Sequence, residues 1–287
     1  MIANLRAELI RLGRWPTTWV LGGTWLLLNL IFGYLFPYLS YRSEGDMGFA
    51  SQVSDDAMAA SLLAEMLPHG VPATMVAGLP MFGGALLLIL GATAVGSGYG
   101  WGTWKTMFTT GPRRATVLAG TVAALGVALV ALVLATLGLD VVASLVVANL
   151  ENQAVVWPAL IEVLKGLGAA LLIGGMWITA GVLLGTLTRG PALAVGLGLV
   201  WALVVENLLR GVAALLGPIE ALTKGLPGTA AGSLAGALGV TPQGQPNGTP
   251  GVLEVLGGGT SVLVLCLYVA GFVAISMLLT QRRDIAG

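Results

Sequence analysis

The residue types that usually carry out chemistry are scarce in this chain. His69 is the only histidine and Cys266 the only cysteine among 287 residues. They cannot supply the paired histidines of a zinc-hydrolase motif, a disulfide framework or a cysteine-based metal site. His69 stands between Pro68 and Gly70, a setting typical of a loop or a helix start. We therefore expect no catalytic residue and no metal ligand in this chain.

The lysines do not belong to a phosphate-binding loop. Such a loop has the pattern GxxxxGK[ST], in which glycine precedes the lysine. Tryptophan, leucine and threonine precede Lys105, Lys165 and Lys224. The chain therefore has no loop of its own that would cradle the phosphates of ATP. If its activity uses ATP, we expect a partner chain to bind and hydrolyse it.

One pair of opposite charges lies inside an apolar stretch, WALVVENLLRGV. Glu206 precedes Arg210 by four residues, which places both on one helical face in the favourable order. A charge at the centre of a bilayer costs about 2.5 to 3.5 kcal/mol on insertion scales. The pattern predicts an ion pair in the outer half of a membrane span. Its role is either structural or that of a gate or substrate contact.

A polar stretch, GYGWGTWKTMFTTGPRR, separates two apolar runs at residues 98–114. It combines Lys105, Arg113 and Arg114 with several aromatic residues and threonines. This composition indicates a loop outside the membrane that contacts a partner.

Composition identifies the class of protein. Hydrophobic residues make up 56% of the chain, charged residues 9%, and the mean hydropathy is +0.92, whereas soluble domains contain about 25% charged residues. The formal net charge is zero, which argues against a nucleic-acid partner, because such partners need a basic surface. We expect an all-α membrane protein that crosses the bilayer several times.

Six apolar runs are long enough to cross the hydrocarbon core, which takes about 20 helical residues. They cover residues 16–38, 71–96, 115–138, 166–187, 191–216 and 252–279. No signal-peptide cleavage site follows the first run, so we expect it to stay in the mature protein. The segment after Gly138 carries Asp140, Asn149, Glu151 and Glu162. We expect it to form a helix on or near the outer surface rather than a seventh span.

Lysine and arginine indicate the orientation, because cytoplasmic loops are enriched in them. With both ends inside, nine of the thirteen basic residues face the cytoplasm and eleven of the thirteen acidic residues face outward. The inner basic set is Arg6, Arg11, Arg14, Lys105, Arg113, Arg114, Arg189, Arg282 and Arg283. We expect six spans, both termini in the cytoplasm, and the cell membrane of a prokaryote as the location.

The amino terminus, MIANLRAELIRLGRWP, has apolar residues at helical spacing, and Arg6, Arg11 and Arg14 lie off that stripe. The pattern predicts an amphipathic helix over 1–15 along the cytoplasmic interface, where basic residues meet lipid headgroups. A generic juxtamembrane helix would explain the same charges.

Glycines indicate how the spans pack. Gly181 and Gly185 form a GxxxG step, which permits close approach of two helices, and Gly83 and Gly84 follow Pro80, which predicts a kink in the second span. Between the fifth and sixth runs, TAAGSLAGALGV predicts a short helix that dips partway back into the membrane from outside.

Together these features resemble the ABC-2 type permeases, the membrane-spanning subunits of ATP-binding cassette exporters. That family combines an amino-terminal elbow helix, six spans, a basic loop after span two, and a re-entrant segment between spans five and six. The resemblance covers essentially the whole chain, a single transmembrane domain over 1–287. Its most specific residues are Gly102-Thr103, Pro112 and Arg114, and the tail Arg283-Asp284-Ile285 is similar to the family ending. Two departures are Gly98, where members often have an acidic residue, and the absence of a lysine near Gly120 and Thr121.

The resemblance implies a transport subunit rather than an enzyme. Two such chains, identical or homologous, would form the substrate pathway, and a dimer of cytoplasmic ATPases would hold ATP and magnesium, with no cofactor on this chain. The cargo would be a hydrophobic or amphipathic compound such as a drug, lipid or peptide. The residues implied to couple to the ATPase are Trp101, Gly102, Thr103, Trp104, Lys105, Phe108, Pro112, Arg113 and Arg114.

Two alternatives remain open. An ATP-independent secondary carrier would need ionisable residues at mid-membrane and often shows an internal repeat. A membrane anchor of a larger assembly would need a larger hydrophilic docking surface than one loop and two tails.

Overall fold

The structure is a computed structural model that describes residues 2–42, 56–100, 102–103, 113–213 and 223–282. This part of the chain contains six helical segments long and apolar enough to cross a membrane. They are Pro16–Arg42, Pro68–Gly100, Arg114–Leu150, Leu160–Thr188, Pro191–Val212 and Gly258–Arg282. The prediction of an all-helical, multi-pass membrane protein is confirmed.

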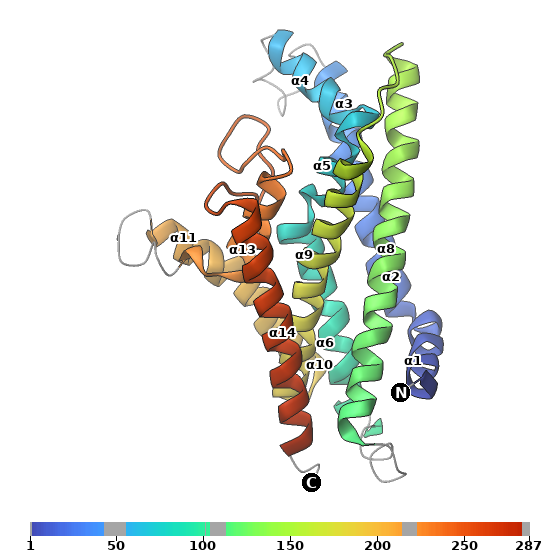
Figure 1. Ribbon diagram of the computed structural model, residues 1–287, viewed down its shortest axis with the longest axis vertical. Helices are drawn as coiled ribbons and strands as arrows, with labels where there is room; N and C mark the ends of the chain where they lie inside the picture. Colours follow the sequence, from blue (N-terminus) through green and yellow to red (C-terminus); the bar gives the residue numbers. More distant parts are fainter. Residues whose placement is uncertain (1, 43–55, 101, 104–112, 214–222, 283–287) are drawn as a thin grey trace.

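Both ends of the described chain lie at the same end of the bundle. Figure 1 shows α1 (Ile2–Arg14) at the end where α14 (Gly258–Arg282) finishes and α8 (Arg114–Leu150) begins. We call this the termini end, and the opposite end, which carries α3 (Phe36–Arg42) and α4 (Asp56–Met66), the loop end. An even number of spans requires this arrangement.

The third span is longer than predicted. Helix α8 runs unbroken for 37 residues, which is about 55 Å, whereas the hydrocarbon core is about 30 Å thick. The prediction of a separate surface helix after Gly138 is therefore wrong, because Asp140 and Asn149 continue α8. No proline interrupts this segment, and the helix ends only where Asn152 adopts a positive φ of 50°. Residues 151–159 then lead without helix to α9 (Leu160–Thr188).

The centre of the bundle is the contact between α6 (Gly84–Gly100) and α9. A Cβ atom added at Gly185 would lie 2.8 Å from the carbonyl oxygen of Ala92, and one at Gly181 would collide with the carbonyl oxygen of Leu88. The two backbones therefore touch, which confirms the packing predicted from the GxxxG step. Trp177 of α9 fills the adjacent core with 2% of its surface exposed.

Three spans contain a wide π-helical turn. These turns are η1 (Ile31–Leu35), η3 (Leu79–Gly83) and η4 (Val200–Val205). In η3, Pro80 has no backbone N–H to donate, and the Gly83 N–H reaches the Gly78 carbonyl at 2.9 Å. The irregularity predicted in the second span is thus a π-turn between α5 (Val71–Ala77) and α6. Such turns are frequent at functional sites.

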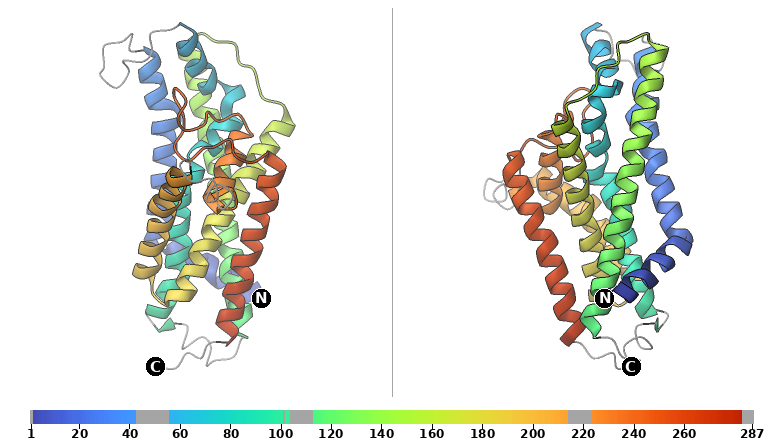
Figure 2. Two further views of the ribbon diagram at one scale, coloured as in Figure 1. Left: turned by 90° about the vertical axis from the view of Figure 1, so that its left-hand side faces the viewer. Right: turned by 45° about the vertical axis from the view of Figure 1, so that its right-hand side comes forward.

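A short buried helix precedes the last span. Helix α13 (Pro227–Gly236) lies between α11 (Glu206–Ala213) and α14, and its residues 227–235 are all buried. The sixth span begins at Gly258 rather than near residue 252, because the preceding segment packs against α13: the N–H groups of Val255 and Leu256 donate to the Ser233 hydroxyl. The predicted short helix is present. Figure 2 shows its place inside the bundle.

Candidate functional site

Helix α1 is joined to the bundle through Arg11, which pairs with the buried Glu8. Glu8 is 7% exposed and accepts hydrogen bonds from Arg11, whose Nη2 lies 2.7 Å from Glu8 Oε2. The same Nη2 donates to the Ala94 carbonyl of α6 at 3.0 Å. Arg6 and Arg14 are exposed. The three predicted arginines therefore differ: Arg11 links α1 to the second span, and the other two face outward.

Helix α1 also lies directly on the third span. A Cβ atom at Gly120 of α8 would stand 3.0 Å from Cβ of Asn4. A larger side chain at this position would press against α1, so Gly120 permits the close approach of α1 and α8.

The polar loop after the second span is described in part. Trp101, Trp104, Lys105, Phe108 and Pro112 lie outside the described residues, whereas Gly102, Thr103, Arg113 and Arg114 lie within them.

Gly102 has a conformation that favours glycine. Its φ is +67°, and its N–H donates to the Tyr99 carbonyl at 3.2 Å just after the end of α6. Arg113 caps α8 and Arg114 is its first residue. Positive side chains are unfavourable at this end of a helix dipole.

Glu206 is fully buried in the half of the fifth span that lies farther from Pro191. It follows η4 and is 0% exposed. Its Oε1 accepts hydrogen bonds from Trp201 Nε1 at 2.9 Å and from the Gly228 N–H at 3.3 Å. Gly228 belongs to the first turn of α13, so the carboxylate sits at the positive end of that helix. A Cβ atom at Gly228 would collide with Glu206 Oε2, which explains the glycine.

The predicted ion pair of Glu206 and Arg210 is not formed between these two described side chains. Arg210 Nε donates to the backbone carbonyl of Glu206 at 3.2 Å, and Nη2 donates to Asn207 Oδ1 at 3.3 Å. The carboxylate instead turns toward α13, where the Gly228 N–H donates to it. The two residues share one helix, as predicted, but the contact is different.

Sequence reasoning missed a polar ladder between the first and third spans. Asn29 Nδ2 donates to Asp140 Oδ1 at 2.6 Å, and Trp25 Nε1 donates to Thr136 Oγ1 at 3.0 Å. Tyr34 adds a hydrogen bond to the Asp140 carbonyl at 3.1 Å. Trp25 and Asn29 are four residues apart on one helix, and Thr136 and Asp140 are four residues apart on the other. This matching i, i+4 spacing of polar residues in two apolar runs could have predicted the contact.

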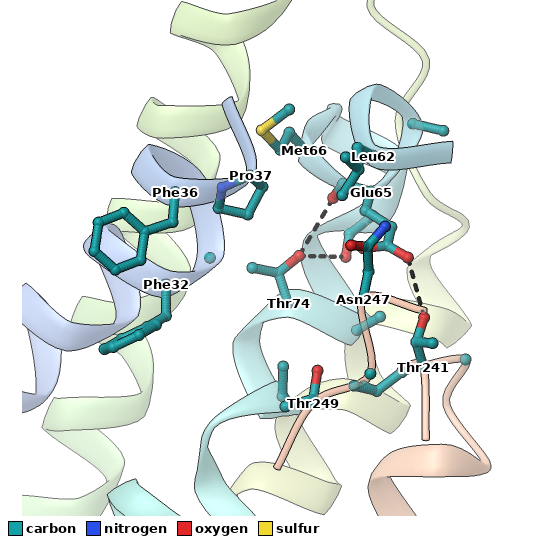
Figure 3. Close-up of a pocket in the computed structure, with 18 of the residues that line it drawn as sticks. Phe32, Phe36, Pro37, Leu62, Glu65, Met66, Thr74, Thr241, Asn247 and Thr249 are labelled. Carbon is teal, nitrogen blue, oxygen red and sulfur yellow. Dashed lines mark hydrogen bonds between the residues drawn. The ribbon is translucent and has the colours of Figure 1, made fainter. Parts of the chain in front are cut away.

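A cavity of about 430 Å³ opens at the loop end. Figure 3 shows Phe32 and Phe36 of the first span on one side and Glu65, Thr241 and Asn247 on the other. Thr241 Oγ1 donates to Glu65 Oε1 at 3.1 Å. Partial burial raises the pKa of the Glu65 carboxyl, and the hydrogen bond from Thr241 opposes that rise.

The only histidine, His69, lines this cavity at the loop end. It is exposed and lies in a short helical turn, Pro68–Gly70. Within the described ranges, no group of three or more His, Cys, Asp or Glu side chains is placed to hold a metal ion.

No known protein family and no curated protein matches the sequence. The function is therefore inferred from the architecture and from the residues described above.

Proposed function

We propose that this chain is the membrane-spanning subunit of an ATP-binding cassette exporter of the ABC-2 type. The observation that carries the proposal is the order of elements. A separate helix α1 precedes six candidate spans whose two ends lie together, and a short buried helix stands between the fifth and sixth spans. The family has the same order of elements.

The termini end faces the cytoplasm in this proposal. Arginines gather there: Arg6 and Arg14 on α1, Arg113 and Arg114 at the start of α8, and Arg189 after α9. Cytoplasmic loops are enriched in such residues. Helix α1 then lies along the inner membrane surface as an elbow helix, in the cell membrane of a prokaryote.

In this proposal, the contacts of α1 couple the membrane spans to the ATPase. Two copies of this chain, or this chain and a homologue, form the pathway, and a dimer of cytoplasmic ATPases binds ATP and magnesium. The Arg11 bond to Ala94 and the contact of Asn4 with Gly120 tie α1 to the second and third spans. A movement of the ATPase dimer against α1 and the loop at 101–114 would therefore move these two spans directly.

Helix α13 is the re-entrant segment of the proposed pathway. It is buried, and the Gly228 N–H in its first turn donates to the Glu206 carboxylate. Release of this contact frees α13 from the fifth span. Glu206 thus takes the role of a gate contact on the outer half of the pathway, and the cargo is a hydrophobic or amphipathic compound.

A second candidate function is an ATP-independent secondary carrier. One observation favours it: Asp140 and Glu206 are buried carboxylates within spans, and Asp140 Oδ2 and Glu206 Oε2 have no hydrogen-bond partner among the residues that the structure describes. Ion-coupled carriers use ionisable groups of this kind.

The test of the exporter is co-purification with an ATPase. The chain is co-expressed with an ATPase that carries a phosphate-binding loop and is encoded beside it. Replacing Trp104 and Lys105 with alanine should leave membrane insertion intact and reduce the recovered ATPase at least severalfold. The control replaces Trp157 and Gln153, which are exposed at the loop end, and should leave recovery unchanged.

Two results would contradict the exporter. Equal recovery of the ATPase with both double variants would contradict the assignment of residues 101–114 as the loop that couples to the ATPase. Transport that continues without ATP and stops when the proton gradient is collapsed would favour the carrier.

A further inference from the structure

The cavity at the loop end has an aromatic wall of fixed shape. Phe32 and Phe36 meet edge to face, with ring centroids 5.3 Å apart and planes at 88°, and Phe32 stacks on Phe82 at 6.3 Å. Phe32 and Phe36 are 57% and 50% exposed. Their exposed faces offer an apolar contact to a ligand in the cavity.

The opposite wall carries one negative charge. Glu65 is the only carboxylate that lines the described cavity, and neither lysine nor arginine lines it. Thr241 fixes one carboxylate oxygen, and the hydroxyl of Thr74 donates to the carbonyl groups of Glu65 and Gly70. The Thr241 hydrogen bond therefore orients the exposed carboxylate, and His69 is the only basic side chain among the described residues that line this cavity.

The depth of the cavity matters for the ligand. Phe36 lies 20 residues beyond Pro16 along the first span, a rise of about 30 Å, which is about the thickness of the hydrocarbon core. The cavity therefore lies near the outer boundary of the membrane. A ligand there meets apolar and aqueous surroundings at the same time, which favours an amphipathic compound.

We propose that this cavity binds an amphipathic ammonium compound. The ammonium group pairs with the Glu65 carboxylate, and the apolar part lies against Phe32 and Phe36, whose rings also attract cations. The volume of about 430 Å³ fits a small organic molecule. An anionic amphiphile is excluded by repulsion from Glu65. The identification of this compound as exported cargo rests on the proposed export function. The binding of the compound to the cavity does not depend on that function.

The test measures binding to the purified full chain in neutral detergent, without any ATPase. The probe is decylammonium, whose N–H groups can donate to the carboxylate, and decanoate is the anionic probe of the same chain length. The wild type should bind the ammonium probe saturably by calorimetry and should not bind decanoate. Glu65→Gln keeps the acceptor for Thr241 and should weaken ammonium binding about tenfold, the loss expected for one charge-assisted contact.

The matched control is Glu254→Gln, an equal charge change at an exposed residue outside the cavity. It should leave affinity unchanged. Phe36→Ala should weaken binding without removing the preference for the cation. Equal affinity of the wild type and Glu65→Gln, equal binding of decanoate, or no saturable binding at all would overturn the proposal.

A second experiment distinguishes two possible sources of the ammonium group, a lipid headgroup and a soluble amphiphile. The measurement is repeated in anionic bilayers with and without a phosphatidylethanolamine lipid. Competition by that lipid assigns the site to a lipid headgroup, and lack of competition assigns it to a soluble amphiphile. Since no ATPase is present, loss of binding would leave the exporter proposal standing, and loss of ATPase coupling would leave the ammonium site standing.

Discussion

At the scale of single residues, Glu206 joins three elements, because it lies in α11 and contacts both η4 and α13. Its carboxylate accepts from Trp201 within its own span and from the first turn of α13. Burying a carboxylate is costly unless hydrogen bonds and favourable charges surround it. The indole N–H, the N-terminus of α13 and the nearby Arg210 supply part of that compensation.

The close contact at Gly228 leads to a first prediction. Gly228→Ala should lower thermal stability in detergent, because the new methyl group collides with Glu206 Oε2. We expect a loss of about 1 to 3 kcal/mol, typical of overpacking. The measurement is thermal unfolding followed by tryptophan fluorescence. Gly211→Ala in α11, where a Cβ meets no atom within 4 Å, should be neutral or slightly stabilising, and equal losses in both variants would contradict the contact.

Glu65 gives a prediction about pH. Its pKa is raised in the folded protein, so the folded state binds more protons than the unfolded state between the ordinary glutamate pKa and the raised value. The contribution of this group to stability is therefore greatest at low pH and is lost as the pH rises through the raised pKa. Glu65→Gln should remove this dependence.

The measurement compares unfolding temperatures of the wild type and Glu65→Gln between pH 4 and pH 7. His69 and all other titrating groups are common to both proteins. The wild type should lose stability relative to the variant as the pH rises. A difference between the two proteins that stays constant over this range would disprove the effect.

At the scale of elements, the contact between α6 and α9 holds the bundle together. Gly181→Ala should place a methyl group against the Leu88 carbonyl and separate the two backbones. We expect a loss of roughly 1 to 3 kcal/mol or more, because backbone atoms cannot move aside as a side chain can. Gly168→Ala on the same helix, with no atom within 4 Å of the new Cβ, is the control. Unchanged unfolding of Gly181→Ala would show that the helices tolerate a wider spacing.

The elements differ in how well the sequence predicts them. Apolar runs of span length and the GxxxG step are local patterns, so the six spans and the position of Gly181 and Gly185 follow from the sequence. The length of α8 does not, because Asp140 is a polar residue whose burial is explained only by Asn29 on another helix. The wide turn η4 contains no proline or glycine, and nothing in its local sequence distinguishes it from a regular helix.

The candidate sites follow the same rule. The proximity of Glu206 and Arg210 along one helix is local and was predictable. The partner that Glu206 meets, Gly228, is 22 residues away in sequence and depends on how α13 enters the bundle. Likewise, three segments that are distant in the sequence line the cavity around Glu65. The spacing of residues in the sequence therefore could not predict this cavity.

At the scale of the whole molecule, much apolar surface faces outward. Large exposed side chains include Leu134 of α8, Val204 of η4 and Leu267 of α14. Monomeric soluble proteins rarely expose apolar patches of this extent. The surface is suited to lipid tails and, in the proposed exporter, to a second permease chain.

The shared position of the two ends gives a prediction about topology. A fluorescent protein fused to either terminus should fluoresce, and alkaline phosphatase fused at either terminus should be inactive, because both ends are proposed to face the cytoplasm. Phosphatase inserted in the segment 151–159 at the loop end should be active. Active phosphatase at a terminus, with an inactive insertion at 151–159, would reverse the orientation.

The wide turn η4 has a consequence for the direction in which the fifth span points. A π-turn takes one residue more than an α-turn, and each residue of a helix advances about 100° around its axis. The six residues Val200–Val205 therefore turn the chain through a smaller angle per residue than an α-helix does. If these same residues formed a regular α-helix, α11 would rotate by about 100° and the Glu206 carboxylate would turn away from Gly228, whereas deletion of one residue would let the wide turn close to an α-turn and leave the direction of α11 unchanged. The pairing of the fifth span with α13 thus depends on the width of this turn as well as on the side chains at the contact.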